Sequence, residues 1–524
     1  MRTVYRNGRV YSPSARDATA FAVENGSITW VGQDDGVGAV PDSDVIDLDG
    51  AFVTPAFVDA HVHATSTGLS LIGLDLGPAA SLREALAEVE RVARATRGRP
   101  IFGSGWDETN WPERRPPTAP ELDRASYGGA VYLSRVDMHS AVVSSALLTA
   151  VPRLAERTGF AADGWLRRDA HDAARSAALA MLTPAQIRDA QLAALRHAAS
   201  LGIGCVHEMA GPAISSADDL TALLALAAGE PLPEVVGYWG ELFGAQTALE
   251  LGAIGAAGDL FCDGSLGSHT AALTDAYADR PNTSGALRFE TGDLSVHIEQ
   301  CVANRLQAGF HAIGDAAVDQ VLDAFELATA RLGRTAGAGS RIEHAEFVRD
   351  PARLARSGLL ASVQPAFDAT WGGPDRMYAE RLGAHRARAL NRFAELASAG
   401  VPLAFGSDAP ATPMGPWASV RAAAYPTDPG AAISPRSAFL AHTRAGWRAA
   451  GRPGDGVLEP GAAATFAVWD AGELGVDAPD ERVTRWSTDP RAAVPGLPDL
   501  RPGQPLPRCL RTVVRGDQVF QLDK

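Results

Sequence analysis

The sequence predicts an α/β protein built on a (β/α)8 TIM-like barrel, with a small β-sandwich domain formed by both ends of the chain. Three observations carry this prediction. Eight short apolar runs recur between residues 57 and 410, and helical stretches separate most of them. Both chain ends are rich in strand-forming residues, whereas the middle alternates between strand and helix patterns. Histidine and aspartate residues stand near the C-terminal ends of several of the runs.

Each of the eight runs is typical of a strand buried on both faces, because apolar residues follow one another without polar alternation. The runs cover residues 57–63, 202–210, 233–239, 258–264, 308–315, 340–347, 359–367 and 402–410. Before the second run, Thr183 and Gln186 form a capping-box pattern with Pro184 at the first helical position, which predicts the start of a helix.

The domain organisation follows from the same patterns. We expect residues 1–53 and 451–524 to form the two parts of the small β-domain, and residues 54–450 to form the barrel. Asn7-Gly8 and Asn25-Gly26 each predict a hairpin in the N-terminal part. Residues 65–180 are too many for one crossover, so we expect an insertion over the C-terminal mouth, where barrel active sites lie.

Composition excludes several classes of protein. The 524 residues include 47 basic and 62 acidic side chains, a net charge of −15, which argues against nucleic acid or an anionic membrane as the main partner. The sequence has no run of about 18 apolar residues and no apolar leader, so we expect a cytoplasmic protein that acts on a small molecule. The widely spaced cysteines are expected to be buried thiols, namely Cys205, Cys262, Cys301 and Cys509.

Five polar residues at strand ends predict a metal site, and they are His61, His63, His311, His344 and Asp408. His61 and His63 point to the same side of their strand, because side chains alternate along a strand. The C-terminal ends of parallel barrel strands meet at one mouth, so all five are expected to converge there. Imidazoles with one carboxylate suit zinc, and also iron, manganese or nickel.

Longer motifs around these residues resemble those of the amidohydrolase superfamily. They are TPAFVDAHVH (54–63), HAIGDAA (311–317), RIEHAEFV (341–348) and FGSDAP (405–410). A closer resemblance, to amidohydrolase family 3 and its N-substituted formamide deformylase branch, rests on GWDETNWP, YLSRVDMHSAVVSSALL, DGSLGSHTAAL and ASVQP. The resemblance runs nearly end to end and implies a metal-dependent hydrolase, and it also implies a homodimer.

One position departs from the pattern that the resemblance implies. Relatives commonly carry a lysine before the DG of the fourth-strand motif, and its carbamate bridges two metals. Here that position is Asp259, and the only lysine of the chain is Lys524. We therefore expect one zinc-like ion held by His61, His63, His311 and Asp408, with His344 at the substrate or at the metal. A second ion remains possible if Asp259, Glu208 or Cys262 supplies ligands.

The predicted chemistry is attack of metal-activated water on a carbonyl. Asp408 is expected to carry the proton to the leaving amine, and His344 or the metal to stabilise the oxyanion. Asp315 is a candidate to orient His311, although a cap on the next helix is the simpler interpretation. The insertion offers candidates for contact with substrate, namely Trp106, Asp107, Trp111, Arg135 and His139.

The sequence thus predicts hydrolysis of a non-peptide C–N bond, an amide or N-substituted formamide, in a small substrate. A deaminase or a cyclic-amide hydrolase on the same site is an alternative. A catalytically silent relative that binds a ligand is another, and only the missing lysine favours it.

Overall fold

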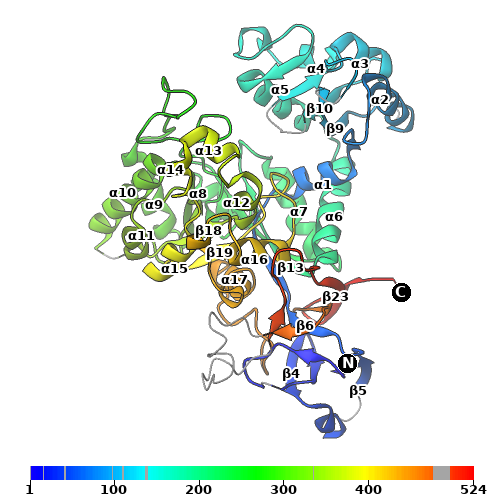
Figure 1. Ribbon diagram of the computed structural model, residues 1–524, viewed down its shortest axis with the longest axis vertical. Helices are drawn as coiled ribbons and strands as arrows, with labels where there is room; N and C mark the ends of the chain where they lie inside the picture. The colour runs from blue at the N-terminus through cyan, green and yellow to red at the C-terminus, as the bar shows by residue number, and fades with distance from the viewer. Residues whose placement is uncertain are drawn as a thin grey trace. The chain divides into compact units, whose positions relative to one another are not determined.

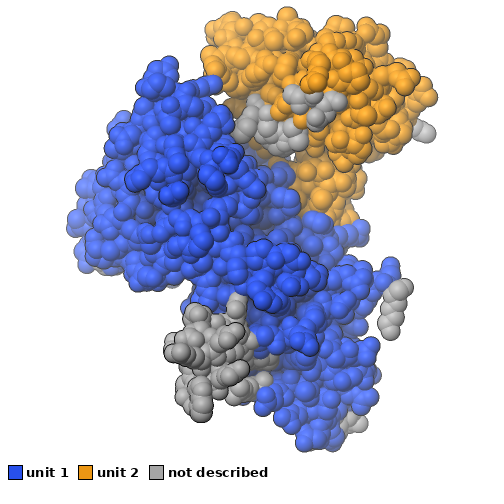
Figure 2. Space-filling model, in the orientation of Figure 1, with its two compact units in different colours: residues 1–63, 195–524 blue, residues 64–194 orange. Residues whose placement is uncertain are grey.

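The computed structural model describes residues 2–15, 17–39, 43–96, 98–108, 111–135, 140–333, 335–475 and 496–523. These residues form two compact units, which Figure 2 colours separately. The first unit contains residues 1–63 and 195–524, and the second contains residues 64–194. Within the described residues, no helix is both long enough and apolar enough to cross a membrane.

The first unit is built on a parallel barrel, which confirms the predicted fold class (Figure 1). Its eight strands follow one another in sequence order around the sheet, and a parallel bridge from Val62 to Ala409 joins the last to the first. The strands are β7 (Phe57–Val62), β13 (Ile203–Ala210), β14 (Glu234–Trp239), β15 (Gly255–Ala256), β16 (Gln307–Ala312), β17 (Arg341–His344), β18 (Leu360–Val363) and β19 (Leu403–Phe405).

Seven of the eight predicted runs overlap a barrel strand, and the fourth was placed wrongly. Its strand β15 covers only Gly255–Ala256, before the predicted run of 258–264. After β15, only Phe261 makes a further bridge, to His311 of β16. Leu260 and Cys262 are nevertheless buried, so this segment is an apolar loop, which periodicity alone does not distinguish from a strand.

Helices follow the barrel strands along the chain. They are α6 (Pro184–Ser200), α7 (Ala217–Gly229), α8 (Ala245–Glu250), α9 (Thr291–Ala303), α10 (Asp315–Leu332), α11 (Pro351–Ser357), α12 (Pro365–Trp371), α13 (Met377–Leu382), α14 (Ala384–Ala387), α15 (Phe393–Ala399), α16 (Pro416–Ala424), α17 (Pro435–Ala441) and α18 (Arg444–Ala449). The predicted capping box at the start of α6 is confirmed. The backbone N–H of Gln186 donates to Thr183 Oγ1 at 3.3 Å, and that of Thr183 donates to Gln186 Oε1 at 3.2 Å.

The two chain ends share one sheet, in the order β2-β6-β20-β23-β24. Its strands are β2 (Arg9–Val10), β6 (Phe52–Pro55), β20 (Phe466–Asp470), β23 (Arg508–Val514) and β24 (Asp517–Gln521). A second sheet, β4-β3-β1-β5, packs against it through an aromatic cluster of Tyr5, Phe21 and Phe466. The Tyr5 and Phe21 rings stack at 4.9 Å, and Phe466 meets each of them edge-on at 5.0 Å.

The second sheet tests the two predicted hairpins. Its strands are β1 (Arg2–Arg6), β3 (Ala20–Glu24), β4 (Ser27–Gly32) and β5 (Ser43–Asp47). Asn25-Gly26 joins β3 to β4 as a hairpin, with φ of 49° and 77°, as predicted. The prediction for Asn7-Gly8 was wrong, because β1 pairs with β3 and β5 while β2 pairs with β6 in the other sheet.

The second unit holds its own five-stranded sheet, in the order β12-β11-β10-β9-β8. It comprises β8 (Leu74–Asp75), β9 (Ile101–Trp106), β10 (Val131–Arg135), β11 (Ser140–Val143) and β12 (Trp165–Arg167), with helices α1 (Ala64–Ile72), α2 (Leu82–Thr96), α3 (Ala119–Ala125), α4 (Ser145–Ala150) and α5 (Arg168–Ala180). An insertion was expected over residues 65–180, and the compact unit runs from Ala64 to Ala194. Its location over the barrel mouth stays a prediction.

The last barrel strand approaches the first so closely that only glycine fits at the junction. A Cβ on Gly406 would lie 2.5 Å from the backbone nitrogen of His61 and 2.7 Å from its Cβ. Both obstacles belong to a buried strand that packing holds in place. Gly406 therefore sets the distance between β19 and β7 at the point where both strands deliver side chains to the mouth.

Gly406→Ala is expected to lower the free energy of unfolding by about 1–3 kcal/mol, because an extra methyl group is forced into a packed core. Denaturant or thermal unfolding followed by circular dichroism measures this loss. Gly292→Ala in α9 is the matched control, because a Cβ there meets nothing within 4 Å. A Gly406→Ala protein as stable as the control would contradict the close approach of β19 to β7.

Candidate metal centre

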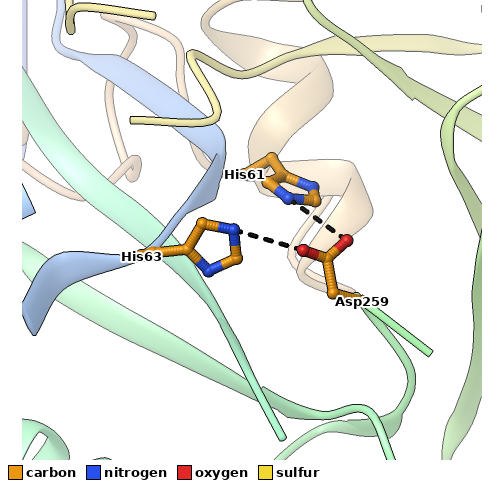
Figure 3. Close-up of side chains that lie close together, drawn as sticks. All are labelled: His61, His63 and Asp259. Carbon is orange, nitrogen blue, oxygen red and sulfur yellow. Dashed lines mark ion pairs between the residues drawn. The ribbon is translucent and has the colours of Figure 1, made fainter. Parts of the chain in front are cut away.

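Six polar side chains from five barrel strands and the loops after them converge at the barrel mouth. His61 lies on β7 and His63 directly after it, His311 lies on β16, and His344 ends β17. Asp259 and Asp408 follow β15 and β19. The five residues predicted as metal ligands are thus brought together, and Asp259 joins them (Figure 3 shows it with His61 and His63).

The Asp259 carboxylate lies at the centre of the cluster, within reach of all four imidazoles. Its Oδ1 is 3.6 Å from His61 Nε2, 3.4 Å from His311 Nδ1 and 3.5 Å from His344 Nε2. Its Oδ2 is 3.2 Å from His63 Nε2. On the other side, Asp408 Oδ1 lies 3.2 Å from His63 Nε2 and 3.5 Å from His61 Nε2.

Each imidazole is fixed by a hydrogen bond from the ring nitrogen that faces away from Asp259. His61 Nδ1 donates to Glu343 Oε2 at 2.9 Å, and His344 Nδ1 donates to Gln364 Oε1 at 2.9 Å. His63 Nδ1 donates to the carbonyl of Met209 at 3.1 Å. His311 Nε2 donates to the carbonyl of Gly264 at 3.2 Å. Because one nitrogen of each neutral ring carries the proton, the other one presents a lone pair toward Asp259.

The nitrogens that face Asp259 fit a metal ion. His61 Nε2, His311 Nδ1, His344 Nε2 and Asp259 Oδ1 are buried and have no hydrogen-bond partner. Buried polar atoms are nearly always paired, so four orphaned atoms at one point indicate a missing common partner. Imidazole nitrogens and carboxylate oxygens are the ligands that zinc and similar ions prefer. The described residues therefore fit one or more divalent metal ions.

Electrostatics favour positive charge at the same point. Burial by itself lowers the pKa of His63, but hydrogen bonds and charge from Asp259 and Asp408 outweigh it and raise that pKa to about 10. Burial raises the pKa of Asp259, yet the surrounding histidines bring it well below its ordinary value. Without metal, protons would supply the positive charge that the carboxylates require. Metal binding is thus expected to displace protons.

The backbone at the site adopts conformations that ordinary residues rarely use. His344, Ala345 and Asp408 have φ of 67°, 45° and 55°. Such strain persists where the surrounding structure enforces it, and it is frequent at functional sites. One enforcing contact is the 2.8 Å hydrogen bond from the Asp408 backbone N–H to the carbonyl of His61.

Two buried aspartates that the sequence analysis did not assign support the ligands. Asp59 Oδ1 accepts hydrogen bonds from the backbone of Ser407 at 2.8 Å and of His61 at 3.4 Å, and so ties β19 to β7. Asp263 accepts from the backbone N–H groups of Ile313, Gly314 and Ala272 at 2.8–3.1 Å.

The aspartate that lies beside His311 is Asp263 and not Asp315. Its Oδ1 lies 3.6 Å from His311 Nε2. Asp315 instead begins α10 and accepts a hydrogen bond from the backbone of Thr274 at 3.0 Å. Asp315 therefore does not orient His311. It does not cap α10 either, because Gly314 is the N-cap residue and no side chain caps the helix.

The substrate-contact candidates of the second unit have partners within that unit. Trp106 and Trp111 are buried, and their indole N–H groups donate to the carbonyls of Leu133 and Ala79 at 2.9 and 2.8 Å. These two tryptophans are core residues, so their contact with substrate is not supported. Arg135 pairs with Asp107 at 3.0 Å. His139 lies outside the described residues, and a role in binding substrate stays a prediction for it.

Of the three candidates for second-metal ligands, the structure brings Asp259 into the cluster. Among the described residues, the clusters that can hold a metal include neither Glu208 nor Cys262. Both side chains are buried, and burial raises the pKa of the Cys262 thiol well above its ordinary value. All four cysteines are free and buried, as the sequence predicted.

A family model described as the amidohydrolase family matches residues 44–520. The chain belongs to the amidohydrolase family. The resemblance inferred from sequence motifs is thereby confirmed, and so is the prediction of an enzyme. The putative amidohydrolase YtcJ of Bacillus subtilis is 28% identical over 459 residues, which cover 81% of this amidohydrolase and 83% of YtcJ.

Two further comparisons support the assignment. An N-substituted formamide deformylase of Arthrobacter pascens is 32% identical over 152 residues, 28% of each chain. The structure of an uncharacterized metal-dependent hydrolase from Pyrococcus furiosus aligns with a TM-score of 0.77 and 31% identity, over 90% of this amidohydrolase and 99% of that chain.

Asp259→Asn is expected to lower the metal content of the purified amidohydrolase by at least about tenfold, because the variant removes the charge that four imidazoles share. Elemental analysis after dialysis measures the number of ions per chain. Asp315→Asn is the control, since Asp315 lies at the start of α10 and touches none of the imidazoles that face Asp259. Equal metal content in both variants would contradict a direct role for Asp259.

Proposed function

We propose that this amidohydrolase hydrolyses a non-peptide C–N bond, an amide or N-substituted formamide, in a small substrate, by means of metal-activated water. The observation that carries the proposal is the set of four oriented imidazole nitrogens around Asp259, with Asp408 beside them. A catalytically silent scaffold has no need for four imidazoles fixed in the ligand orientation.

We propose two ions that would share Asp259, in place of the single ion expected from sequence. Neighbouring ligand atoms of a tetrahedral ion with bonds of about 2.1 Å lie about 3.4 Å apart. The imidazoles of His61 and His63 lie 3.2–3.6 Å from the carboxylates of Asp259 and Asp408, and these four residues would hold one ion. Asp259 and the nitrogens of His311 and His344, at 3.4–3.5 Å, would form the other. His344 would then be a metal ligand and act on substrate only through the metal.

The proposed chemistry divides between the metal and the chain. A bound divalent ion lowers the pKa of water toward neutrality and polarises a carbonyl oxygen. Asp408 keeps 14% of its side chain exposed and Asp259 only 5%, so Asp408 is the carboxylate that substrate and solvent can reach. Asp408 therefore takes the proton of the attacking water and delivers it to the leaving amine.

The relatives support hydrolysis of a C–N bond, and the substrate class is proposed from one match to part of the chain. The deformylase match covers 152 residues, and its name describes cleavage of an N-substituted formamide. Two aromatic rings lie beside the ligands: that of Phe367 stacks on His344 with centroids 5.9 Å apart, and that of Phe261 lies 4.7 Å from His311. An apolar wall beside the metal ligands suits a substrate with an alkyl or aryl group next to the amide.

Asp408→Asn is expected to lower kcat/KM for N-substituted formamides and simple amides by at least about 100-fold, because an amide cannot carry the proton. A screen that detects the released amine and carboxylic acid, which is formate for the formamides, measures the reaction. A deaminase would instead release ammonia without a carboxylic acid. Asp315→Asn again provides the control. Unchanged activity of Asp408→Asn would contradict the proton-transfer role, and wild-type protein without metal after supplementation would contradict the proposed function.

A further inference from the structure

A buried arginine lies inside the barrel, one layer beneath the metal centre. Arg341 of β17 is 1% exposed, although it carries a permanent charge. Its Nε donates to Glu343 Oε1, and its Nη2 donates to Glu343 Oε2 at 3.0 Å and to the carbonyl of Ala60 at 2.6 Å. Its Nη1 donates to His207 Nδ1 at 3.2 Å. The guanidinium also lies 4.5 Å from the centroid of the Tyr238 ring.

Glu343 links this arginine to the metal centre. The carboxylate accepts from Arg341 on both oxygens, and its Oε2 also accepts from His61 Nδ1 at 2.9 Å. Glu343 therefore has a permanent cation on one side and His61 on the other, and the two hydrogen bonds from Arg341 fix the direction of its carboxylate.

His61 is distinguished from the other imidazoles by this partner. Among the described residues, the outer nitrogens of His63, His311 and His344 donate to neutral oxygens at hydrogen-bond distance. Of these four described imidazoles, His61 is the one that donates to a carboxylate at hydrogen-bond distance, and Arg341 pairs with that carboxylate from the other side. The nearest carboxylate to an outer nitrogen of the other three is Asp263, 3.6 Å from His311 Nε2. A carboxylate behind a ligating imidazole fixes its tautomer and raises its basicity toward the metal.

We propose that Arg341 and Glu343 are positioning residues that hold His61 as the strongest imidazole ligand. They would thereby control how tightly the metal ion bound by His61 is retained. This inference rests on the proposed function. The bidentate pairing sets the plane of the Glu343 carboxylate, and that plane sets the direction of the His61 ring. Arginine is required for this because its planar fork makes two parallel hydrogen bonds, which a lysine ammonium cannot do.

Stability alone does not explain the pair. A buried ion pair often contributes nothing to stability relative to apolar residues of the same size, because desolvation offsets the attraction. The hydrogen bonds of Arg341 also reach Ala60, the residue before His61, so one side chain holds both the strand and the imidazole. The geometry therefore points to a role at the metal.

The test is the rate at which a chelator removes metal from the loaded protein, followed by elemental analysis or an indicator dye. Arg341→Met/Glu343→Gln removes both charges but keeps an oxygen that accepts from His61. We expect metal loss about 10–100-fold faster than in the wild type, the usual effect of removing such a partner. The melting temperature of the metal-free double variant is expected to stay near that of the metal-free wild type.

The matched control is a second ion pair of the same unit, away from the metal. Arg452 and Glu234 pair at 2.6 Å and are partly buried. Arg452→Met/Glu234→Gln is expected to retain metal as the wild type does. Equal metal loss from both double variants, or wild-type retention in Arg341→Met/Glu343→Gln, would overturn the inference.

A second variant keeps the test decisive if the double variant does not fold. Glu343→Asp keeps the charge next to Arg341 but withdraws the carboxylate from His61 by one methylene group, so metal loss should still accelerate. Wild-type retention in Glu343→Asp would overturn the inference. If the wild-type protein binds no metal, the proposed function is overturned as well. If the wild type binds metal and the variants lose it no faster, the inference alone is overturned.

Discussion

The site depends on the contact between the Asp259 carboxylate and four imidazoles. Asp259 lies 3.2–3.6 Å from His61, His63, His311 and His344, whose strands are far apart in sequence. A buried carboxylate without compensating positive charge is costly. Protons on the imidazoles can supply that charge, as the raised pKa of His63 indicates, and a divalent metal would supply it while it takes the imidazole nitrogens as ligands.

The barrel makes this contact possible by delivering six side chains from the ends of five strands, two of them from β7. Gly406 allows β19 to lie against β7, and Asp59 joins the same two strands through backbone hydrogen bonds. Beneath the ligands, Arg341 and Glu343 fill the barrel interior with a paired charge instead of an apolar layer. The support of the site therefore extends into the barrel core.

The sequence predicted the barrel and the five ligands because their signals are local. For example, His61 and His63 lie at the end of an apolar run, so one short stretch of sequence shows both the strand and its ligands. The fourth strand was misplaced because the buried loop around Phe261 has the same apolar pattern as a strand. Glu343 and Gln364 were missed because their role depends on pairing between neighbouring strands, although Glu343 stands next to His344 in the quoted motif. Trp106 and Trp111 were predicted to contact substrate because a sequence does not show that these side chains are buried within a separate unit.

The central claim is that Asp259 takes the place of a bridging lysine and connects two metal ions without any lysine in the barrel. Anomalous X-ray diffraction from crystals of the metal-loaded protein, collected at the absorption edge of the bound metal, tests it most directly. We predict two peaks, one beside His61, His63 and Asp408 and the other beside His311 and His344, each in contact with Asp259. A single peak at the barrel mouth, or no peak there, would contradict this account.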